Sequence, residues 1–170
     1  MKPEPAARSG SDPRFDPGPW QAELRAFLAR MGACDDLDDL VQETFLRAVR
    51  KPPEGPARAY LYQVALNLFR DRGRRLERGV RVLEGAARID HRASVDPADT
   101  VERRDLAERA WRLILTLPDH QRAALILRID RQFTYREAAR VLGCSEATVR
   151  QHFYLGMKAV RAVIAGVPHD

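Results

Sequence analysis

Apolar residues recur along most of this chain at the three- and four-residue spacing of amphipathic helices, and no segment shows the two-residue period of a strand. In the N-terminal half such stripes run over residues 20–31, 37–48 and 58–68. Gly32 follows the first stripe, and the proline-rich loop 51–56 separates the second from the third. The pattern predicts an all-α fold that begins with three helices.

Between Leu76 and Val101 the periodicity is lost, apart from a weak helical pattern over residues 80–87. It then returns, and Pro118 is placed at the first position of a further predicted helix. We therefore expect two small helical domains joined by a flexible linker. In chain order the expected parts are a disordered leader 1–19, a first domain 20–78, the linker 79–101 and a second domain 102–166. The sequence leaves open whether the two domains move freely or pack against each other.

The segment from Thr134 to Lys158 has the pattern of a complete helix-turn-helix. Thr134 and Glu137 have the spacing of a capping box, which predicts the start of a first short helix. Gly143 follows where a left-handed residue is needed, and Ser145 is placed to cap a second helix. The residues expected to face inward are Tyr135, Ala138, Ala139 and Leu142 in the first helix, and Val149, Phe153, Val160 and Ile164 in the second.

The start of the second helix leaves four side chains facing outward: Glu146, Arg150, Gln151 and Tyr154. Arginine pairs with guanine and glutamine with adenine in the major groove, so Arg150 and Gln151 are the best candidates for base contacts. The other candidates for base-edge or phosphate contacts are Ser145, Thr148, Tyr154 and Lys158. For Lys158, a solvated charge without a DNA contact is an equal alternative.

Charge is segregated along the chain, and this is more informative than the net charge of +5. Residues 35–43 hold five acids and no base, whereas residues 58–81 hold seven arginines against two acids. Two different partner surfaces are therefore indicated. No apolar run reaches the roughly 20 residues needed to span a membrane, and the N-terminus lacks the apolar centre of a secretory signal. We expect a cytoplasmic protein.

The sequence offers no chemistry-bearing cluster. Cys34 and Cys144 are far apart, and neither has a second cysteine or a histidine at metal-ligand spacing, so no metal site is predicted. There is no glycine-rich phosphate loop and no carboxylate pair distinguishable from surface charge. We expect neither an enzyme activity nor a cofactor.

Three stretches together resemble the extracytoplasmic-function (ECF, group IV) sigma factors of bacterial RNA polymerase. "DLDDLVQETFLRA" is similar to region 2.2 of that family, "ARAYLYQVALNLFRDRGRR" to regions 2.3 and 2.4, and "LPDHQRAALILRIDRQFTYREAARVLGCSEATVRQHF" to region 4. The resemblance covers nearly everything from Trp20 to Ala165. The segment "ARAYLYQVALNLFRD" and the His152 after "TVRQ" resemble the sequences of the iron-uptake-type subgroup.

The resemblance implies an alternative sigma factor that directs promoter-specific transcription initiation. Its first domain would bind the β′ clamp of core RNA polymerase and open the minus-ten element of promoter DNA, and its second would bind the minus-thirty-five element and the β flap. An anti-sigma factor is a further implied partner. The matching polymerase-binding residues are Asp39, Gln42, Glu43 and Arg47. Those placed to capture unpaired minus-ten DNA are Tyr60, Tyr62, Asn67, Asp71, Arg74 and Arg75.

A structural interpretation stands beside several of these assignments. Leu40, Val41 and Phe45 have the helical spacing of core residues, and we expect them in the core rather than at an interface. For Tyr62, covering the helix face explains the residue as well as stacking on a base does. Asp71 is equally placed to pair with a neighbouring arginine.

Two departures from the family pattern keep alternative functions open. Loop 51–56 stands where the family's specificity loop holds a flipped minus-ten base, but it carries prolines and no aromatic residue. Residues 155–157 are Leu-Gly-Met where relatives often have Arg-Ala-Arg, and the loss of two arginines predicts a weaker electrostatic attraction to DNA. One alternative is a sigma-like decoy that binds an anti-sigma factor and never touches DNA. The other is a conventional helix-turn-helix regulator that reads duplex DNA without polymerase.

Overall fold

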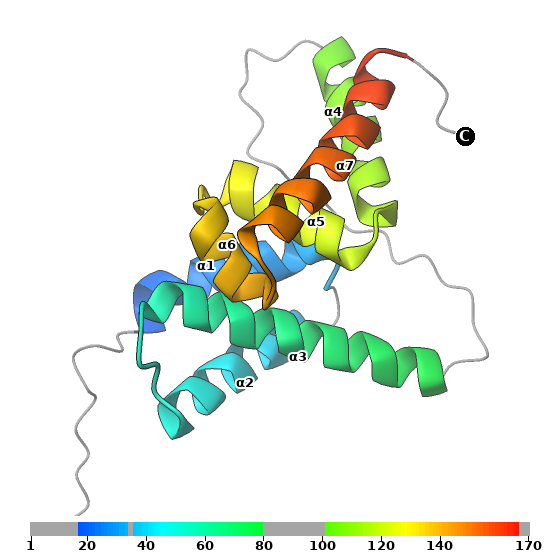
Figure 1. Cartoon of the computed structure of the whole chain (residues 1–170). Coiled ribbons are helices and arrows are strands. Elements are labelled where there is room, and N and C mark those ends of the chain that lie inside the picture. The colour runs from blue at the N-terminus through cyan, green and yellow to red at the C-terminus, as the bar shows by residue number, and fades with distance from the viewer. Residues whose placement is uncertain (1–16, 34–35, 80–100, 167–170) are drawn as a thin grey trace, which may run out of the picture.

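All regular structure in the described part of the chain is helical, as the sequence predicts (Figure 1). This computed structural model describes residues 17–33, 36–79 and 101–166, and the predicted helix at 80–87 lies outside them, as do most of the predicted leader and linker. The helices are α1 (Pro17–Met31), α2 (Leu37–Arg50), α3 (Ala57–Gly79), α4 (Val101–Thr116), α5 (Asp119–Leu125), the π-helical turn η1 (Ile126–Asp130), α6 (Tyr135–Leu142) and α7 (Glu146–Ile164).

The predicted capping signals of the helix-turn-helix are all present. The Glu137 N–H donates to Thr134 Oγ1 at 3.2 Å, and the Glu137 carboxylate accepts from the Thr134 N–H at 2.7 Å. The Thr134 hydroxyl donates to the same carboxylate, and this bond together with the one from the Thr134 N–H favours the charged form and lowers the pKa of Glu137. Gly143 ends α6 with a φ of 65°, and Ser145 caps α7 by accepting from the Thr148 N–H at 3.1 Å. Local interactions therefore define both ends of the turn.

Three details differ from the sequence-based expectations. Pro118 immediately precedes α5 instead of occupying its first position. The π-helical turn after α5 was not predicted; in it the Arg131 N–H donates to the carbonyl of Ile126, five residues back, at 3.0 Å. Ile164 is exposed instead of facing inward, because the apolar cluster that α7 shares with α4 and α5 ends at Val160.

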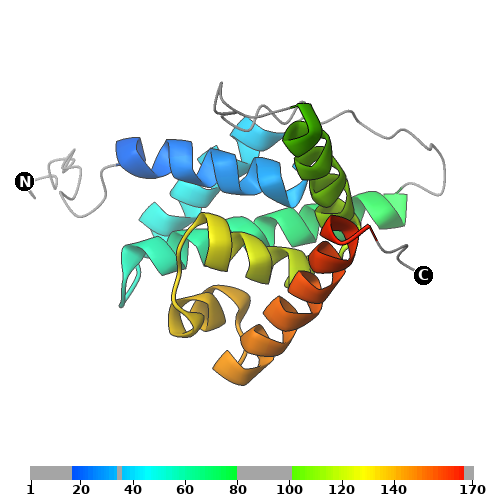
Figure 2. The same cartoon turned by 90° about the horizontal axis from the view of Figure 1, so that it is seen from above.

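The two predicted domains share one hydrophobic core. Phe27 of α1, Tyr62 of α3 and Phe133, which precedes α6, are all buried in one cluster. The ring centroid of Tyr62 lies 4.8 Å from that of Phe27 and 4.9 Å from that of Phe133. Around these rings α3 packs on α6 and α1 packs on α5 (Figures 1 and 2). The structure thus shows the two halves packed against each other, which the sequence left open.

Directional bonds accompany this apolar contact. Arg58 of α3 donates from Nη2 to the backbone carbonyl of Arg131 at 2.9 Å. In the other direction, Arg122 of α5 donates from Nη1 to the carbonyl of Met31, at the end of α1. Each half therefore places an arginine on the backbone of the other, and charged donors make the stronger class of hydrogen bonds. The register between the halves is set by these bonds as well as by packing.

Gly156 of α7 is buried where this helix packs on α5. A Cβ atom at this position would lie 2.8 Å from Cδ1 and 2.9 Å from Cγ of Leu125. Space, and not an unusual backbone conformation, therefore selects glycine here. Even the Cβ of an alanine at this position would press on Leu125 and force α7 away from α5.

We predict that Gly156→Ala lowers the free energy of unfolding. Overpacking costs about 1 to 3 kcal/mol, and the better helix propensity of alanine returns only about 1 kcal/mol. Gly73→Ala is the matched control, because Gly73 also lies within a helix but has no atom within 4 Å of its Cβ position. That control should gain roughly 0.5 to 1 kcal/mol. Urea unfolding followed by circular dichroism measures both, and an equal gain in the two variants would contradict the close approach.

Candidate nucleic-acid and polymerase interfaces

The outward face of α7 carries the residues predicted to contact the minus-thirty-five element. Arg150, Gln151, Tyr154 and Lys158 are all exposed, and Tyr154 is 64% exposed, which is unusual for an aromatic side chain. The opposite face is anchored, since Val149 is fully buried and Phe153 and Val160 are half-buried. The helix therefore has one face for packing and one that is free to meet a partner.

Ser145 and Thr148, the other two predicted contacts, already bond to each other. Their hydroxyl oxygens are 2.8 Å apart, in addition to the capping bond between the Thr148 N–H and Ser145 Oγ. Ser145 is exposed and Thr148 is half-buried. Both hydroxyls thus shape the start of α7, and a phosphate contact by either would share an oxygen that is already in use.

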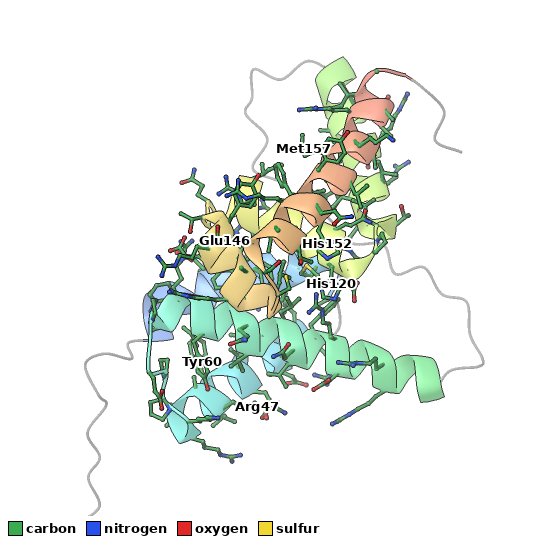
Figure 3. All side chains as sticks on the ribbon, in the orientation of Figure 1. Arg47, Tyr60, His120, Glu146, His152 and Met157 are labelled. Atoms are coloured by element: carbon green, nitrogen blue, oxygen red, sulfur yellow. The ribbon has the colours of Figure 1, made fainter. Side chains whose placement is uncertain are left out.

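His152 of α7 is half-buried against α5 instead of lying on the outward face. Its ring stacks on that of His120 with centroids 5.3 Å apart, and Figure 3 shows the two rings side by side near α3. Arg70 of α3 donates to Nδ1 of His120 at 3.3 Å, a bond that only the unprotonated ring can accept. Desolvation by burial, and after it the charge of Arg70, lower the pKa of His120. His152 therefore has a structural role in this arrangement.

Two of the predicted minus-ten residues line a shallow pocket between α2 and α3. The pocket has a volume of about 310 Å³ and is bordered by Tyr60 and Asn67 of α3. Tyr60 is fixed there, because its hydroxyl donates to the carbonyl of Lys51 at 2.7 Å. The remaining lining residues are Arg47, Arg50, Lys51 and Val64. An aromatic ring surrounded by cationic groups suits a nucleotide, with the ring available to a base and the cations to its phosphate.

A second hollow of about 430 Å³ lies further along the same two helices. It brings together Glu43 and Arg47, predicted for polymerase, with Asp71 and Arg75, predicted for DNA. Asp71 pairs with Arg74 at 3.0 Å, which agrees with the structural interpretation of this residue. The two predicted surfaces therefore adjoin each other, and Arg47 borders both hollows.

Tyr62 is separated from the other minus-ten candidates. It is 0% exposed, lies between Phe27 and Phe133, and donates its hydroxyl to Glu23 Oε2 at 3.1 Å. Burial and the nearby Glu23 carboxylate raise the pKa of Tyr62 to about 12. Two residues turn a helix by about 200°, so Tyr62 and Tyr60 project from nearly opposite sides of α3. In this arrangement the structure favours the packing interpretation for Tyr62.

A sequence signal for this burial exists. Tyr62, Ala65, Leu66 and Phe69 follow the i, i+3, i+4, i+7 pattern of a second inward stripe. The first three are buried and Phe69 is half-buried. Because α3 packs on α2, α1 and α6, apolar residues cover most of its circumference.

Helix α2 separates its core residues from its candidate polymerase contacts. Leu40 and Val41 are buried and Phe45 is half-buried, which confirms their assignment to the core. The predicted polymerase-binding residues lie on the remaining surface: Asp39, Gln42 and Arg47 are exposed, and Glu43 is half-buried. Glu43 and Arg47 pair with each other, Nε to Oε1, at 2.9 Å.

The exposed face of α2 also carries two large apolar side chains that the sequence analysis missed. Leu46 is 52% exposed and Val49 is 68% exposed. With Asp39 and Gln42 they form a stripe at i, i+3, i+7 and i+10, which runs along one side of the helix. That spacing was visible in the sequence, where α2 has apolar residues on two faces and needs only one for the core. We call these four residues the α2 outer stripe.

The fold and these surfaces together define a helical, two-part factor that reads DNA through a helix-turn-helix. Residues 19–79 match the family described as Sigma-70 region 2, and residues 107–160 match Sigma-70, region 4. "ECF RNA polymerase sigma factor EcfG" of Rhodopseudomonas palustris (strain TIE-1) is 35% identical over 133 residues, which are 75% of this chain and 71% of that protein. The chain belongs to the ECF family of RNA polymerase sigma factors.

Two solved structures have the same fold. The sigma factor RpoE in complex with the anti-sigma factor NepR, from Bartonella quintana, matches with a TM-score of 0.63 and 24% identity, covering 85% of this chain and 91% of that one. CnrH in complex with the cytosolic domain of CnrY matches with a TM-score of 0.60 and 24% identity, covering 88% of each chain. Within the described ranges, no helix is long and apolar enough to cross a membrane, and no group of His, Cys, Asp and Glu side chains is placed to hold a metal ion.

We predict that the packed arrangement loses stability as the pH falls below about 6.5, the ordinary pKa of histidine. The packed form holds the pKa of His120 below that value, so the unfolded chain takes up a proton first and stability falls with falling pH. Arg70 and His152 both oppose the extra charge, and Asp119 acts in the opposite sense.

The measurement is the urea midpoint at about pH 7.5 and about pH 5.5, spanning the titration range of histidine. In His120→Gln, which keeps a hydrogen-bond acceptor but does not titrate, the loss between the two conditions should be smaller. An unchanged loss would assign the pH dependence to other groups.

Proposed function

We propose that the chain binds core RNA polymerase through the α2 outer stripe, captures the minus-ten element at the pocket beside Tyr60, and reads the minus-thirty-five element with α7. The main support for this proposal is one observation: the exposed side chains that are candidates for partner contacts lie on the segments that resemble regions 2.2, 2.3 and 4. The neighbouring faces of the same helices are buried. The exposure of side chains in the structure and the resemblance of the sequence to the family are independent observations, and both indicate the same surfaces.

The α2 outer stripe suits a helical partner. Residues spaced at i, i+3, i+7 and i+10 meet a second helix along a continuous seam. Leu46 and Val49 would supply apolar contact area, while Asp39 and Gln42 would supply orientation and electrostatic attraction. The β′ clamp is the partner that we propose for this seam.

The pocket between α2 and α3 suits one unpaired nucleotide. Tyr60 offers a ring face or edge, Asn67 offers an amide for a base edge, and Arg50 and Lys51 offer charges for the phosphate. Arg74 and Arg75 are exposed further along α3, where they would follow the DNA backbone. Asp71 would orient Arg74 through the ion pair between them. Tyr62 joins this set only in a form whose halves have separated.

Promoter length requires such a separation. Elements centred 10 and 35 base pairs upstream are about 85 Å apart along a duplex with roughly 3.4 Å per base pair. A compact chain of this length is only about 40 Å across. The 21 residues between Gly79 and Val101 span at most about 70 Å, which with the two domains is enough. The domains 20–78 and 102–166 therefore act as two readers on DNA, and the packed arrangement is a promoter-free form.

We further propose an anti-sigma factor as a partner and the cytoplasm, where polymerase and DNA meet, as the location. One structure of similar fold is the sigma factor RpoE in complex with the anti-sigma factor NepR, and another is CnrH in complex with the cytosolic domain of a second protein, CnrY. The iron-uptake-type subgroup also remains a proposal, and it rests on the wording of α3 and on His152 alone.

The decoy alternative rests on the departure at 155–157. Leu155 and Met157 stand there in place of the two arginines of the family pattern, and the packing of Gly156 against Leu125 does not account for that loss. Against the decoy alternative stand Arg150 and Gln151, the two candidates for base contacts, which are both exposed on the outward face of α7.

Run-off transcription tests the function as a whole. We predict that the purified chain, mixed with core RNA polymerase and a library of genomic fragments, initiates transcripts at defined positions, and that Arg150→Ala reduces them. A guanine contact is worth about 1–3 kcal/mol, so the reduction should be roughly five- to 150-fold at limiting factor. A decoy would give no defined transcript. A conventional regulator would bind promoter duplex without polymerase and would not be retained on immobilised core enzyme.

A second prediction tests the α2 outer stripe. The double variant Leu46→Ala with Val49→Ala should bind core polymerase roughly 30-fold more weakly, because truncated apolar anchors at an interface cost about 1 kcal/mol each. Ile129→Ala, at another exposed apolar residue far along the chain, is the matched control. All three substitutions lie at exposed sites, so the thermal stability should change little. Equal affinities of the double variant and the control would exclude the stripe from the interface.

A further inference from the structure

The ring of Tyr135, the first residue of α6, lies against two arginines that come from other elements. The Cζ atom of Arg128, in η1, is 4.2 Å from the ring centroid. The Cζ atom of Arg150, in α7, is 4.5 Å from the same centroid. Both distances are well inside the range of about 6 Å within which a guanidinium group is attracted to an aromatic ring.

Tyr135 is a fixed platform. It directly follows Thr134, the N-cap residue of α6. It is half-buried and packs against the hydrophobic core. Its ring also meets that of Phe153 edge to face, with centroids 6.0 Å apart and an interplanar angle of 82°. Contacts from three directions therefore restrict its orientation.

The guanidinium groups of the two arginines have different polar partners. Arg128 donates from Nη1 to the backbone carbonyl of Phe133, so its guanidinium belongs to the packing beneath the helix-turn-helix. The side chain of Arg150 is 61% exposed, and its partner besides the ring is the Glu146 carboxylate, 3.7 Å from Nη2. Such a solvent-exposed ion pair is weak. The ring is thus the main restraint on a side chain whose donors remain available.

We propose that Tyr135 is a positioning residue for Arg150: its ring holds the guanidinium group so that the donor edge faces the base that Arg150 reads. This rests on the proposed base contact of Arg150 and deepens it. A free arginine side chain samples many rotamers, and a side chain that is already oriented loses less freedom on binding. The stack therefore adds affinity only for sequences in which Arg150 makes its bidentate contact.

The experiment uses the complete chain with core RNA polymerase and a duplex DNA library with a randomised upstream element. The preferred sequence selected by the unaltered protein, and its single-base variants, then serve as probes for Arg150→Ala, Tyr135→Leu, Tyr135→Phe and the double variant of Arg150→Ala with Tyr135→Leu. Tyr135→Phe is the matched control, because it keeps the aromatic face and removes only the hydroxyl.

We expect Arg150→Ala to abolish the preference at one base pair. Tyr135→Leu should weaken binding about two- to fivefold, the worth of an exposed cation–π contact. That loss should be confined to probes that carry the base read by Arg150, and it should vanish in the double variant compared with Arg150→Ala alone. Tyr135→Phe should bind like the unaltered protein.

Other outcomes separate this proposal from the function on which it rests. If Tyr135→Leu weakens all probes equally, or does so with and without Arg150, the residue is only structural and the positioning role is wrong. If Arg150→Ala flattens the preference but Tyr135→Leu does not, positioning alone is wrong. If Arg150→Ala leaves every preference intact, the base contact is wrong and the positioning role fails with it.

A measurement without DNA guards against a loss caused by poor folding. Stacking on an aromatic ring shifts the Arg150 Nε–H proton resonance upfield. This shift should be present in the unaltered protein and in Tyr135→Phe, and it should be lost in Tyr135→Leu while the circular dichroism spectrum stays helical. A resonance that is the same in all three proteins would overturn the proposal.

Discussion

The arrangement of this sigma factor depends on one contact, the insertion of Phe133 against Tyr62 and Phe27. These three rings come from η1–α6, α3 and α1, and they join two halves that the sequence separates by a long polar segment. Arg58 closes the contact, with its Cζ atom 4.3 Å from the Phe133 ring centroid and its donor on the carbonyl of Arg131. Since the rings are fully buried, the position of α6 and α7 relative to α3 follows from this contact.

The contact between Phe133, Tyr62 and Phe27 buries one candidate DNA-binding residue and leaves the other candidate surfaces exposed. It withholds Tyr62 from solvent, yet the pocket beside Tyr60, the α2 outer stripe and the outward face of α7 all remain accessible. Under the proposed function, the packed form would restrict promoter binding mainly through geometry, because the two proposed reading surfaces are held closer together than the two promoter elements. The proposed polymerase contact through α2 would need no rearrangement of this kind.

Features set by neighbouring residues could be predicted from the sequence. The capping box at Thr134, the left-handed Gly143 and the cap at Ser145 each depend on residues within one turn, and each is present. The features that could not be predicted depend on contacts between distant segments. The burial of Tyr62 needs Phe133, and the need for glycine at position 156 needs Leu125. Leu46 and Val49 were different, because their spacing was visible in the sequence but no role was assigned to the apolar residues outside the core stripe of α2.

Separation of the halves exposes Phe27, Tyr62 and Phe133 to water, and burial of each large apolar side chain is worth about 1.5–3 kcal/mol. Opening therefore costs several kcal/mol before the bonds of Arg58 and Arg122 are considered. A partner shifts this equilibrium only by binding the separated form more tightly than the packed form. Under the proposed function, contact with the α2 outer stripe would not distinguish the two forms, whereas simultaneous contact with both promoter elements would. The proposal therefore implies that the packed chain docks on polymerase first, and that the aromatic contact opens only when both halves engage DNA.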